Sequence, residues 1–494
     1  MRRRHRWAPA LLGFSLILRA APVSAQAAVP PDTPSGHRMT ALLKAFETGT
    51  PAALRAFLSE NLAEVSLKEV PVERRVERLS AIVEEQGPLE FAKLIQGAGL
   101  DTSFLARSKK TGDWLEIGMM LEPAPSYRIR ALRFERVDGP GAAPGAPREE
   151  PKGSDAKVIS SLEPLLQKAS EANEFSGVVL IAQNGKILFH KAYGLADRDL
   201  GVPNRPDTKF NVGSINKVFT QVAIGQLAEQ GRLAFSDTIR RNLPDYPSPA
   251  ADRITIQQLL TMSSGLGDFF GAAFDATPKN RLRTLADYLP LFAKEPLLFE
   301  PGTSRRYSNA GYIVLGLIIE KASGQSYYDY VRKRVFEPAG MKDTDCFELD
   351  AIVPNRATGY TLEDENGKPL PARRANIYEL PARGSSAGGG YSTAEDLLRF
   401  DVAMRSERLL SPDYTDWFFS DQARPPAPVT AAAASAGAPR KRAGGRGFAG
   451  GTAGVNAVIE MDLDTGYTVV VLSNFDPPSA EKVAKTIRQW LGLR

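Results

Sequence analysis

The chain has 494 residues, of which 43% are hydrophobic and 24% are charged, and its formal net charge is +5. This length is enough for two or three domains, and the composition is that of an ordinary globular protein rather than a disordered one. A single cysteine, Cys346, excludes an internal disulfide framework.

The first 25 residues have the pattern of an export signal. MRRRHRW is basic, ALLGFSLIL is a short apolar run, and Val23-Ser24-Ala25 resembles a cleavage site. We expect cleavage after about Ala25 and a periplasmic or secreted protein without a stable membrane span. The segment carries five arginines and no acidic residue, so 57 basic and 57 acidic residues remain. This balance gives no support to nucleic-acid binding.

Cys346 lies too far along the chain for lipid attachment after the signal, and we expect a core-packed thiol.

Residues 37–137 are expected to form a small α+β unit. MTALLKAF, PAALRAFLSE and VERRVERLSAIVEE have helical spacing, and SFLARSK, WLEIGMML and SYRIRALRFERV are strand-like. This order resembles the NTF2-like accessory domains found beside some exported hydrolases. The segment shows no clustered polar constellation, so we expect a spacer or binding role rather than catalysis. Residues 138–156 are rich in Pro, Gly and Ala and are expected to be a linker.

Residues 157–494 are expected to form a second α+β unit, an antiparallel sheet flanked by helices. FSGVVLIAQNGKILFHKAYG predicts a hairpin at Asn184-Gly185, and VNAVIEMDLDTGYTVVVLSN predicts another near the chain end, followed by the helix EKVAKTIRQWLGL. We expect the first and last strands to share one sheet, with a helical insertion between them. Residues 423–446 are expected to be a low-complexity loop.

Ser214 and Lys217 stand three residues apart at the start of the apolar segment NKVFTQVAIGQLAEQ. Side chains at this spacing share a helix face, and a desolvated lysine can activate a serine for acyl transfer. The helix start also offers free backbone N–H groups to an oxyanion. The alternative is a helix-capping serine beside a solvated lysine. Two further Ser-x-x-Lys matches, Ser154–Lys157 and Ser479–Lys482, fall in the predicted linker and the terminal helix.

Tyr307-Ser308-Asn309 lies just before a second apolar helix. A phenol near an ammonium group can relay a proton, and an amide can orient Lys217 or a substrate carbonyl. In isolation, this motif would more often be a buried tyrosine beside a helix cap.

About residues 156–494 resemble the serine beta-lactamase / penicillin-binding-protein superfamily, especially class C beta-lactamases and related esterases and D-amino-acid peptidases. The resemblance rests on FSGVVLIAQNGKILFHKAYGLAD, FNVGSINKVFT, ITIQQLLTMSSGL, EPGTSRRYSNAGYIVLG and SSAGGGYSTAEDLLRF, in the family's order. It implies that Ser214 is the acylated nucleophile, Lys217 its base and Tyr307 the proton relay, with Asn309 as the motif's amide.

The family's third motif is Lys-Thr-Gly or His-x-Gly, and Phe448-Ala449-Gly450 stands in its place. Gly450 would let the strand approach a substrate, and the N–H of Gly451 could join that of Ser214 as an oxyanion hole. Loss of the cation puts penicillin hydrolysis and carboxylate-directed peptidase activity in doubt. An uncharged ester or amide is less affected.

Other chemistries fit the sequence less well. Gly384–Gly388 matches the Gly-x-Ser-x-Gly elbow, but the histidines His5, His37 and His190 all precede it, so the required histidine is missing. We expect His190 to be structural. We expect no cofactor or metal, and a small ester, amide or cell-wall-type peptide as substrate; oligomeric state is not indicated. The competing hypothesis is a non-catalytic binding or sensing protein of the same fold, which Phe448 favours.

Overall fold

The computed structural model describes residues 29–69, 72–96, 100–137, 155–364, 368–420, 422, 442 and 444–493. They form two compact units that divide between residues 149 and 150. The predicted signal, residues 138–154 of the predicted linker, and most of the predicted loop 423–446 lie outside the described residues.

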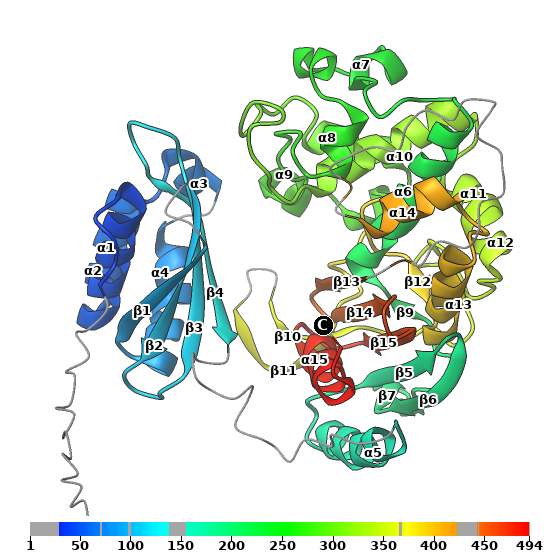
Figure 1. Ribbon diagram of the computed structural model, residues 1–494, viewed down its shortest axis with the longest axis horizontal. Helices are drawn as coiled ribbons and strands as arrows, with labels where there is room; N and C mark the ends of the chain where they lie inside the picture. The colour runs from blue at the N-terminus through cyan, green and yellow to red at the C-terminus, as the bar shows by residue number, and fades with distance from the viewer. Residues whose placement is uncertain are drawn as a thin grey trace, which may run out of the picture. The chain divides into compact units, whose positions relative to one another are not determined.

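The N-terminal unit packs helices against one face of a four-stranded antiparallel sheet of order β1-β2-β3-β4 (Figure 1). Burial alternates along β3 because one face of the sheet meets the helices. The core includes Leu42, Phe46, Phe104 and Ile117. The elements are α1 (Pro34–Thr48), α2 (Pro51–Asn61), α3 (Glu64–Glu69), α4 (Val72–Gln86), β1 (Leu89–Gln96), β2 (Asp101–Ser108), β3 (Trp114–Leu121) and β4 (Ile129–Val137).

The predicted helices and strands of this unit are all present, but α3 and β1 were not predicted from the sequence. The segment LEFAKLIQ of β1 has no clean alternation, and its register against β2 shifts twice. Such a strand depends on its partner more than on its own pattern. The NTF2-like resemblance stays a prediction.

The second unit is built on a five-stranded antiparallel sheet of order β13-β14-β15-β5-β6. Its strands are β5 (Gly177–Gln183), β6 (Lys186–Tyr193), β13 (Gly445–Thr452), β14 (Val455–Asp462) and β15 (Tyr467–Ser473). β15 pairs with β5, with Val469 opposite Ile181, so the first and last long strands share one sheet as predicted. Asn184 and Gly185 both have positive φ, 50° and 79°, as the predicted tight hairpin requires.

Helices cover both faces of this sheet (Figure 1). The helices α5 (Asp155–Glu171) and α15 (Ser479–Leu491) pack on one face, and α13 (Ala394–Arg405) packs on the other against β15 and β5. The presence of α5 corrects the linker boundary of 156, because the helix begins at Asp155. Its buried residues recur every fourth position, at Val158, Leu162 and Leu166, and this amphipathic stripe holds the helix to the sheet.

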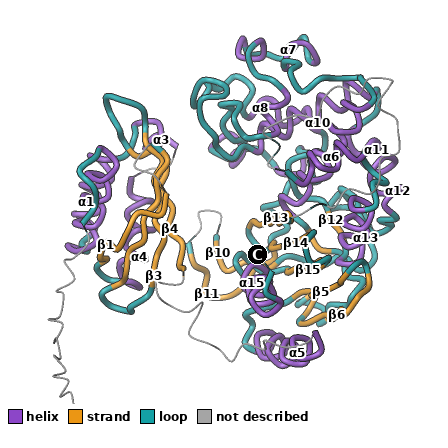
Figure 2. Tube along the Cα trace, in the orientation of Figure 1, coloured by secondary structure: helices purple, strands orange, loops and turns teal. Residues whose placement is uncertain are grey.

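A mostly helical region lies between β6 and β13, with long loops (Figure 2). Its helix α6 is buried over almost its whole length, as predicted. β13 starts at Gly445, so the predicted loop 423–446 extends two residues too far. The helices are α6 (Asn216–Glu229), α7 (Ile239–Asn242), α8 (Ile256–Leu260), α9 (Ala272–Ala276), α10 (Asn309–Ser323), α11 (Tyr327–Val331), α12 (Glu337–Ala339), α13 and α14 (Pro412–Phe419). The short strands are β7 (Leu195–Asp197), β8 (Val202–Pro203), β9 (Phe210–Asn211), β10 (Tyr360–Glu363), β11 (Pro369–Ala375) and β12 (Tyr391–Ser392).

In the part of the chain that the structure describes, no helix has the length and apolar character needed to cross a bilayer.

Candidate active site

Ser214 lies in a single 3₁₀ turn, Gly213–Ile215, that leads directly into α6. Gly213 has a φ of 50°, and a Cβ there would lie 2.9 Å from the backbone of Gly450 and Gly451, so a glycine is needed on both counts. Lys217 is the second residue of α6 and is 5% exposed. The alternative of a solvated lysine therefore does not hold.

The hydroxyl oxygen of Ser214 accepts two hydrogen bonds. The Tyr307 hydroxyl donates at 2.6 Å, and Nζ of Lys217 donates at 3.1 Å. The structure thus brings together the three predicted catalytic side chains around one oxygen atom. The other serines with this spacing differ: Ser479 is bonded to Ser473 at 2.9 Å, and Ser154 lies outside the described residues.

Among the residues that the structure describes, Lys217 is held by neutral groups rather than by a direct ion pair. Its ammonium group donates to Oδ1 of Asn309 at 2.7 Å and to the carbonyl oxygen of Ala387. Burial lowers the pKa of Lys217 to about 7, with the nearby charge of Asp268 opposing this shift. Near neutral pH a large fraction of the amine is therefore unprotonated and able to take a proton from Ser214.

Tyr307 extends from the loop before α10 and is 51% exposed, but its hydroxyl points into the site. Burial of this hydroxyl raises the pKa of Tyr307, although the bond to Ser214 works against the rise. The phenol therefore stays protonated near neutral pH and can donate a proton.

Asn309 is the first residue of α10, after the helix cap Ser308. Its Nδ2 donates to Oδ2 of Asp268 at 2.8 Å while its Oδ1 faces Lys217. Asp268 was missed by the sequence analysis. It lies 41 residues before Asn309, and no local spacing could have linked the two.

The β13 strand runs against the backbone of the serine turn. A Cβ on Gly450 would lie 2.1 Å from the carbonyl oxygen of Val212 and 2.6 Å from the backbone nitrogen of Ser214. This close approach brings Gly451, which lines the same cavity as Ser214, beside the nucleophile. The two backbone N–H groups are the predicted oxyanion hole.

Phe448 stands two residues before Gly450 on β13 and therefore on the same face of the strand. Its ring packs on Phe418 of α14 at 6.0 Å between centroids, and the Arg446 guanidinium lies 4.7 Å from the ring centre. The position that carries a cation or imidazole in the resembled family is thus a phenyl ring here, in contact with Phe418 and with the Arg446 guanidinium.

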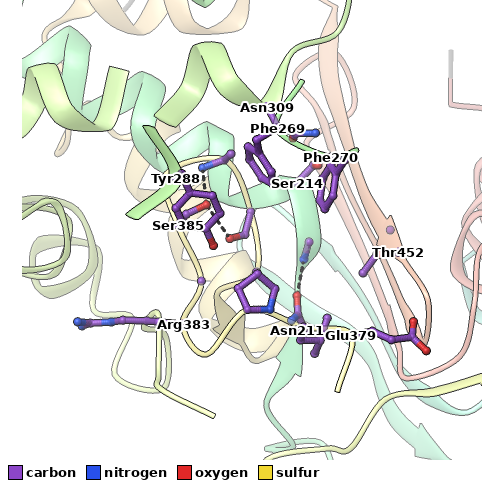
Figure 3. Close-up of a pocket in the computed structure, with 18 of the residues that line it drawn as sticks. Asn211, Ser214, Phe269, Phe270, Tyr288, Asn309, Glu379, Arg383, Ser385 and Thr452 are labelled. Carbon is purple, nitrogen blue, oxygen red and sulfur yellow. Dashed lines mark hydrogen bonds between the residues drawn. The ribbon is translucent and has the colours of Figure 1, made fainter. Parts of the chain in front are cut away.

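A cavity of about 320 Å³ opens at Ser214. In Figure 3, Phe269 and Phe270 project beside Ser214, whereas Arg383 points away from it. The Arg383 guanidinium lies 3.6 Å from the Tyr328 ring centre, and its Nε donates to the carbonyl of Cys346. Arg383 and Glu379 are the charged residues of the lining. Its apolar and aromatic members are Phe269, Phe270, Tyr288, Tyr307, Leu349, Leu380, Pro381 and Ala387.

The competing motifs have structural roles. Ser386, the centre of the Gly-x-Ser-x-Gly match, is fully buried and donates to the carbonyl of Tyr312. Burial lowers the pKa of His190, which lies on β6 away from the cavity lining. Cys346 is a buried free thiol as predicted, and burial raises its pKa to about 12. Among the described residues, no group of three or more His, Cys, Asp or Glu side chains could hold a metal ion.

The fold and this site define a class of protein. Residues 162–493 match the family model described as Beta-lactamase, and the chain belongs to that family. Its second unit has the beta-lactamase fold, which it shares with a solved penicillin binding protein.

The sequence identity between this chain and individual relatives is moderate. Penicillin-binding protein 4* of Bacillus subtilis is 32% identical over 52% of this chain and 58% of its own length. Esterase EstB of Burkholderia gladioli is 31% identical over 54% of this chain and 74% of its own length. The chain thus spans little more than half of the former. A penicillin binding protein from Bacillus halodurans superposes with a TM-score of 0.56 at 30% identity, covering 68% of this chain and 99% of that one.

Proposed function

We propose that this protein is an exported hydrolase that cleaves ester or amide bonds of uncharged substrates through an acyl-enzyme on Ser214, in the manner of an esterase or D-amino-acid peptidase. The observation that carries the proposal is the Ser214 hydroxyl between Tyr307 and Lys217, at 2.6 Å and 3.1 Å. The similarity to an esterase and to penicillin-binding proteins supports the same chemistry.

The geometry suggests the order of events. Neutral Lys217 takes the hydroxyl proton of Ser214 as the oxygen attacks the substrate carbonyl carbon. The N–H groups of Ser214 and Gly451 stabilise the oxyanion. Tyr307 gives its proton to the leaving alcohol or amine and regains one from the Lys217 ammonium. Neutral Lys217 then takes a proton from a water molecule as the water oxygen attacks the acyl carbon. The Lys217 ammonium returns that proton to Oγ of Ser214 as the ester bond breaks, which releases the carboxylic acid product.

The cavity favours neutral substrates. Its wall near Ser214 is aromatic, and Phe448 supplies no cation for a substrate carboxylate. Beta-lactam hydrolysis is therefore expected to be weak. Small neutral esters and amides are therefore the favoured substrate classes, and cell-wall-type peptides that carry a carboxylate are expected to be poorer substrates. The signal-like residues 1–25 support a periplasmic or secreted location.

An acylating probe tests the proposal. The protein is treated with a fluorophosphonate, and its intact mass is compared with those of Ser214→Ala and Ser479→Ala. We expect one adduct on the wild type and on Ser479→Ala, and none on Ser214→Ala. A folded wild type without an adduct would support the second candidate, a non-catalytic binding or sensing protein, which the apolar packing of Phe448 favours. A panel of acyl esters, a chromogenic beta-lactam and a D-Ala-D-Ala peptide then ranks the substrates.

A further inference from the structure

Asp268 links two parts of the site through its two carboxylate oxygens. Oδ1 accepts the backbone N–H groups of Phe269 at 2.8 Å and Phe270 at 3.3 Å. Oδ2 accepts the side-chain amide of Asn309 at 2.8 Å and its backbone N–H at 3.3 Å. One carboxylate therefore fixes the turn that carries the aromatic wall and also the amide that contacts Lys217.

The orientation of the Asn309 amide decides whether Lys217 faces its carbonyl oxygen or its NH₂ group. With Nδ2 bonded to Asp268, the amide must present Oδ1 to the Lys217 ammonium, at 2.7 Å. If the amide turned over, an N–H₂ group would face the ammonium, and two donors would oppose each other. A carboxylate is acceptor-only when ionised, so it enforces the observed orientation.

We infer that Asp268 is a positioning residue, which acts on Ser214 through Asn309 and Lys217 rather than by touching the substrate. It holds the base in reach of the nucleophile and sets the local charge around it. This inference rests on the proposed function, since it assigns to Lys217 the role of base.

The charge of Asp268 acts on Lys217 together with several other groups. Asp268 raises the pKa of Lys217 against the larger effect of burial. The rings of Tyr307 and Tyr312 lie 4.8 Å and 5.5 Å from Nζ of Lys217, and Arg446 on β13 acts electrostatically on Tyr312. Burial raises the pKa of Asp268 itself, while its hydrogen bonds oppose the rise.

Asp268→Asn tests the inference because it keeps the shape and removes the charge. In this variant an NH₂ donor replaces one of the two carboxylate oxygens. The hydrogen bonds from Asn309, or those from the backbone N–H groups of Phe269 and Phe270, are therefore lost. We expect kcat to fall about tenfold to hundredfold, as for a misplaced catalytic group. The acidic limb of the kcat/KM profile should move to lower pH, because loss of a negative charge lowers the pKa of Lys217 further.

In the double variant Asp268→Asn/Asn309→Asp, the two side chains exchange roles. An amide N–H at position 268 then donates to a carboxylate at position 309. We expect it to recover part of the kcat that each single variant loses. Its acidic limb should move to higher pH than that of the wild type, because the new carboxylate contacts Lys217 directly. Asp287→Asn is the matched control: Asp287 caps a turn through the N–H groups of Arg283 and Thr284, and its loss should leave kcat and the pH profile unchanged.

The inference is overturned if folded Asp268→Asn keeps the wild-type kcat and pH profile. It is also overturned if only the melting temperature falls, since that is what a purely structural residue would show. If the wild type itself takes no adduct and hydrolyses no ester, the proposed function fails instead. The effect of Asp268 on Lys217 is then still measurable from the NMR titration of ¹³C-labelled lysine, assigned with Lys217→Met, in the full-length chain. If the pKa of Lys217 is the same in Asp268→Asn as in the wild type, the inference is contradicted even when the protein shows no hydrolase activity.

Discussion

The carbonyl oxygen of Val212 leaves no room for a Cβ on Gly450, because the two atoms would lie 2.1 Å apart. Gly450→Ala must therefore push β13 away from the serine turn, and the N–H of Gly451 would move with it. We expect acylation to slow by about 100-fold, the cost of one lost oxyanion donor. Stopped-flow acylation by an activated ester measures this rate.

Gly447 is the matched control on the same strand. A Cβ there would lie 3.5 Å from the nearest atoms, all in the Glu460 side chain, which is ordinary contact. Gly447→Ala should acylate at the wild-type rate. Equal rates for the two alanine variants would show that β13 does not contribute to the oxyanion hole.

Tyr307→Phe removes only the hydroxyl that contacts Ser214 at 2.6 Å. We expect kcat to fall by about 10²–10⁴-fold, the usual contribution of a positioned general acid. The melting temperature should change little, because the residue is half exposed. Tyr378→Phe, at a site that is 85% exposed, should leave both quantities unchanged. An active Tyr307→Phe enzyme would assign proton transfer to another group.

The pKa of Lys217, about 7, predicts how activity depends on pH. The neutral amine is the base, so kcat/KM should rise with pH through an acidic limb near 7 and then level off. Lys217→Arg should be inactive at every accessible pH, because a guanidinium does not lose its proton. A pH profile of ester hydrolysis checks both expectations. An acidic limb far below 7 would contradict the role of Lys217.

The same shift predicts a change of stability with pH. The pKa of Lys217 falls from 10.5 in the unfolded chain to about 7 in the folded one, so between these values the unfolded chain binds more protons. The free energy of unfolding should therefore rise with pH over this window. Below pH 7 the folded protein bears the cost of a buried ammonium.

Lys217→Met should abolish that rise and be more stable than the wild type at pH 6. Urea unfolding at pH 6 and pH 9 measures the difference, with Lys186→Met at the exposed end of β6 as control. If the two variants respond to pH alike, Lys217 is not the source of the effect.

The sequence predicted those parts of the site that depend on local geometry. The spacing of Ser214 and Lys217 needs only a helix start, and α6 follows from its own apolar pattern. Two other groups around Lys217 were not predictable in this way. Asp268 bonds to Asn309 from a position 41 residues before it, and the carbonyl of Ala387 accepts from Lys217 from a position 170 residues after it. Only tertiary packing brings these groups together.

Helix α5, which was not predicted either, has a similar cause. Pro164 inside α5 argues locally against a helix, yet the burial of Leu162 and Leu166 against the sheet holds the helix together. At position 448, the sequence position and the tertiary contact differ in how far they could be predicted. The place of Phe448 in the third motif stays a prediction from the sequence, whereas its packing on Phe418 was not predictable, because α14 lies outside any pattern of β13.

Phe448→His tests what the replaced position costs the enzyme. Residue 448 shares a strand face with Gly450, which lies against the Ser214 turn, so an imidazole there is directed toward the site. A hydrogen-bonding group at this position can stabilise the developing charge and help to hold a substrate carboxylate. We expect turnover of a generic ester to rise, and turnover of a carboxylate-bearing substrate to rise more.

Phe448→Leu is the control, because it removes the ring from Phe418 and Arg446 without adding a polar group. It should gain nothing on either substrate, so that any gain of Phe448→His comes from the imidazole rather than from loosened packing. Steady-state rates on a matched pair of esters, one neutral and one carrying a carboxylate, separate the two effects. If the folded histidine variant gains on neither ester, the third motif lies elsewhere, and the apolar contact at position 448 is not what sets the substrate range.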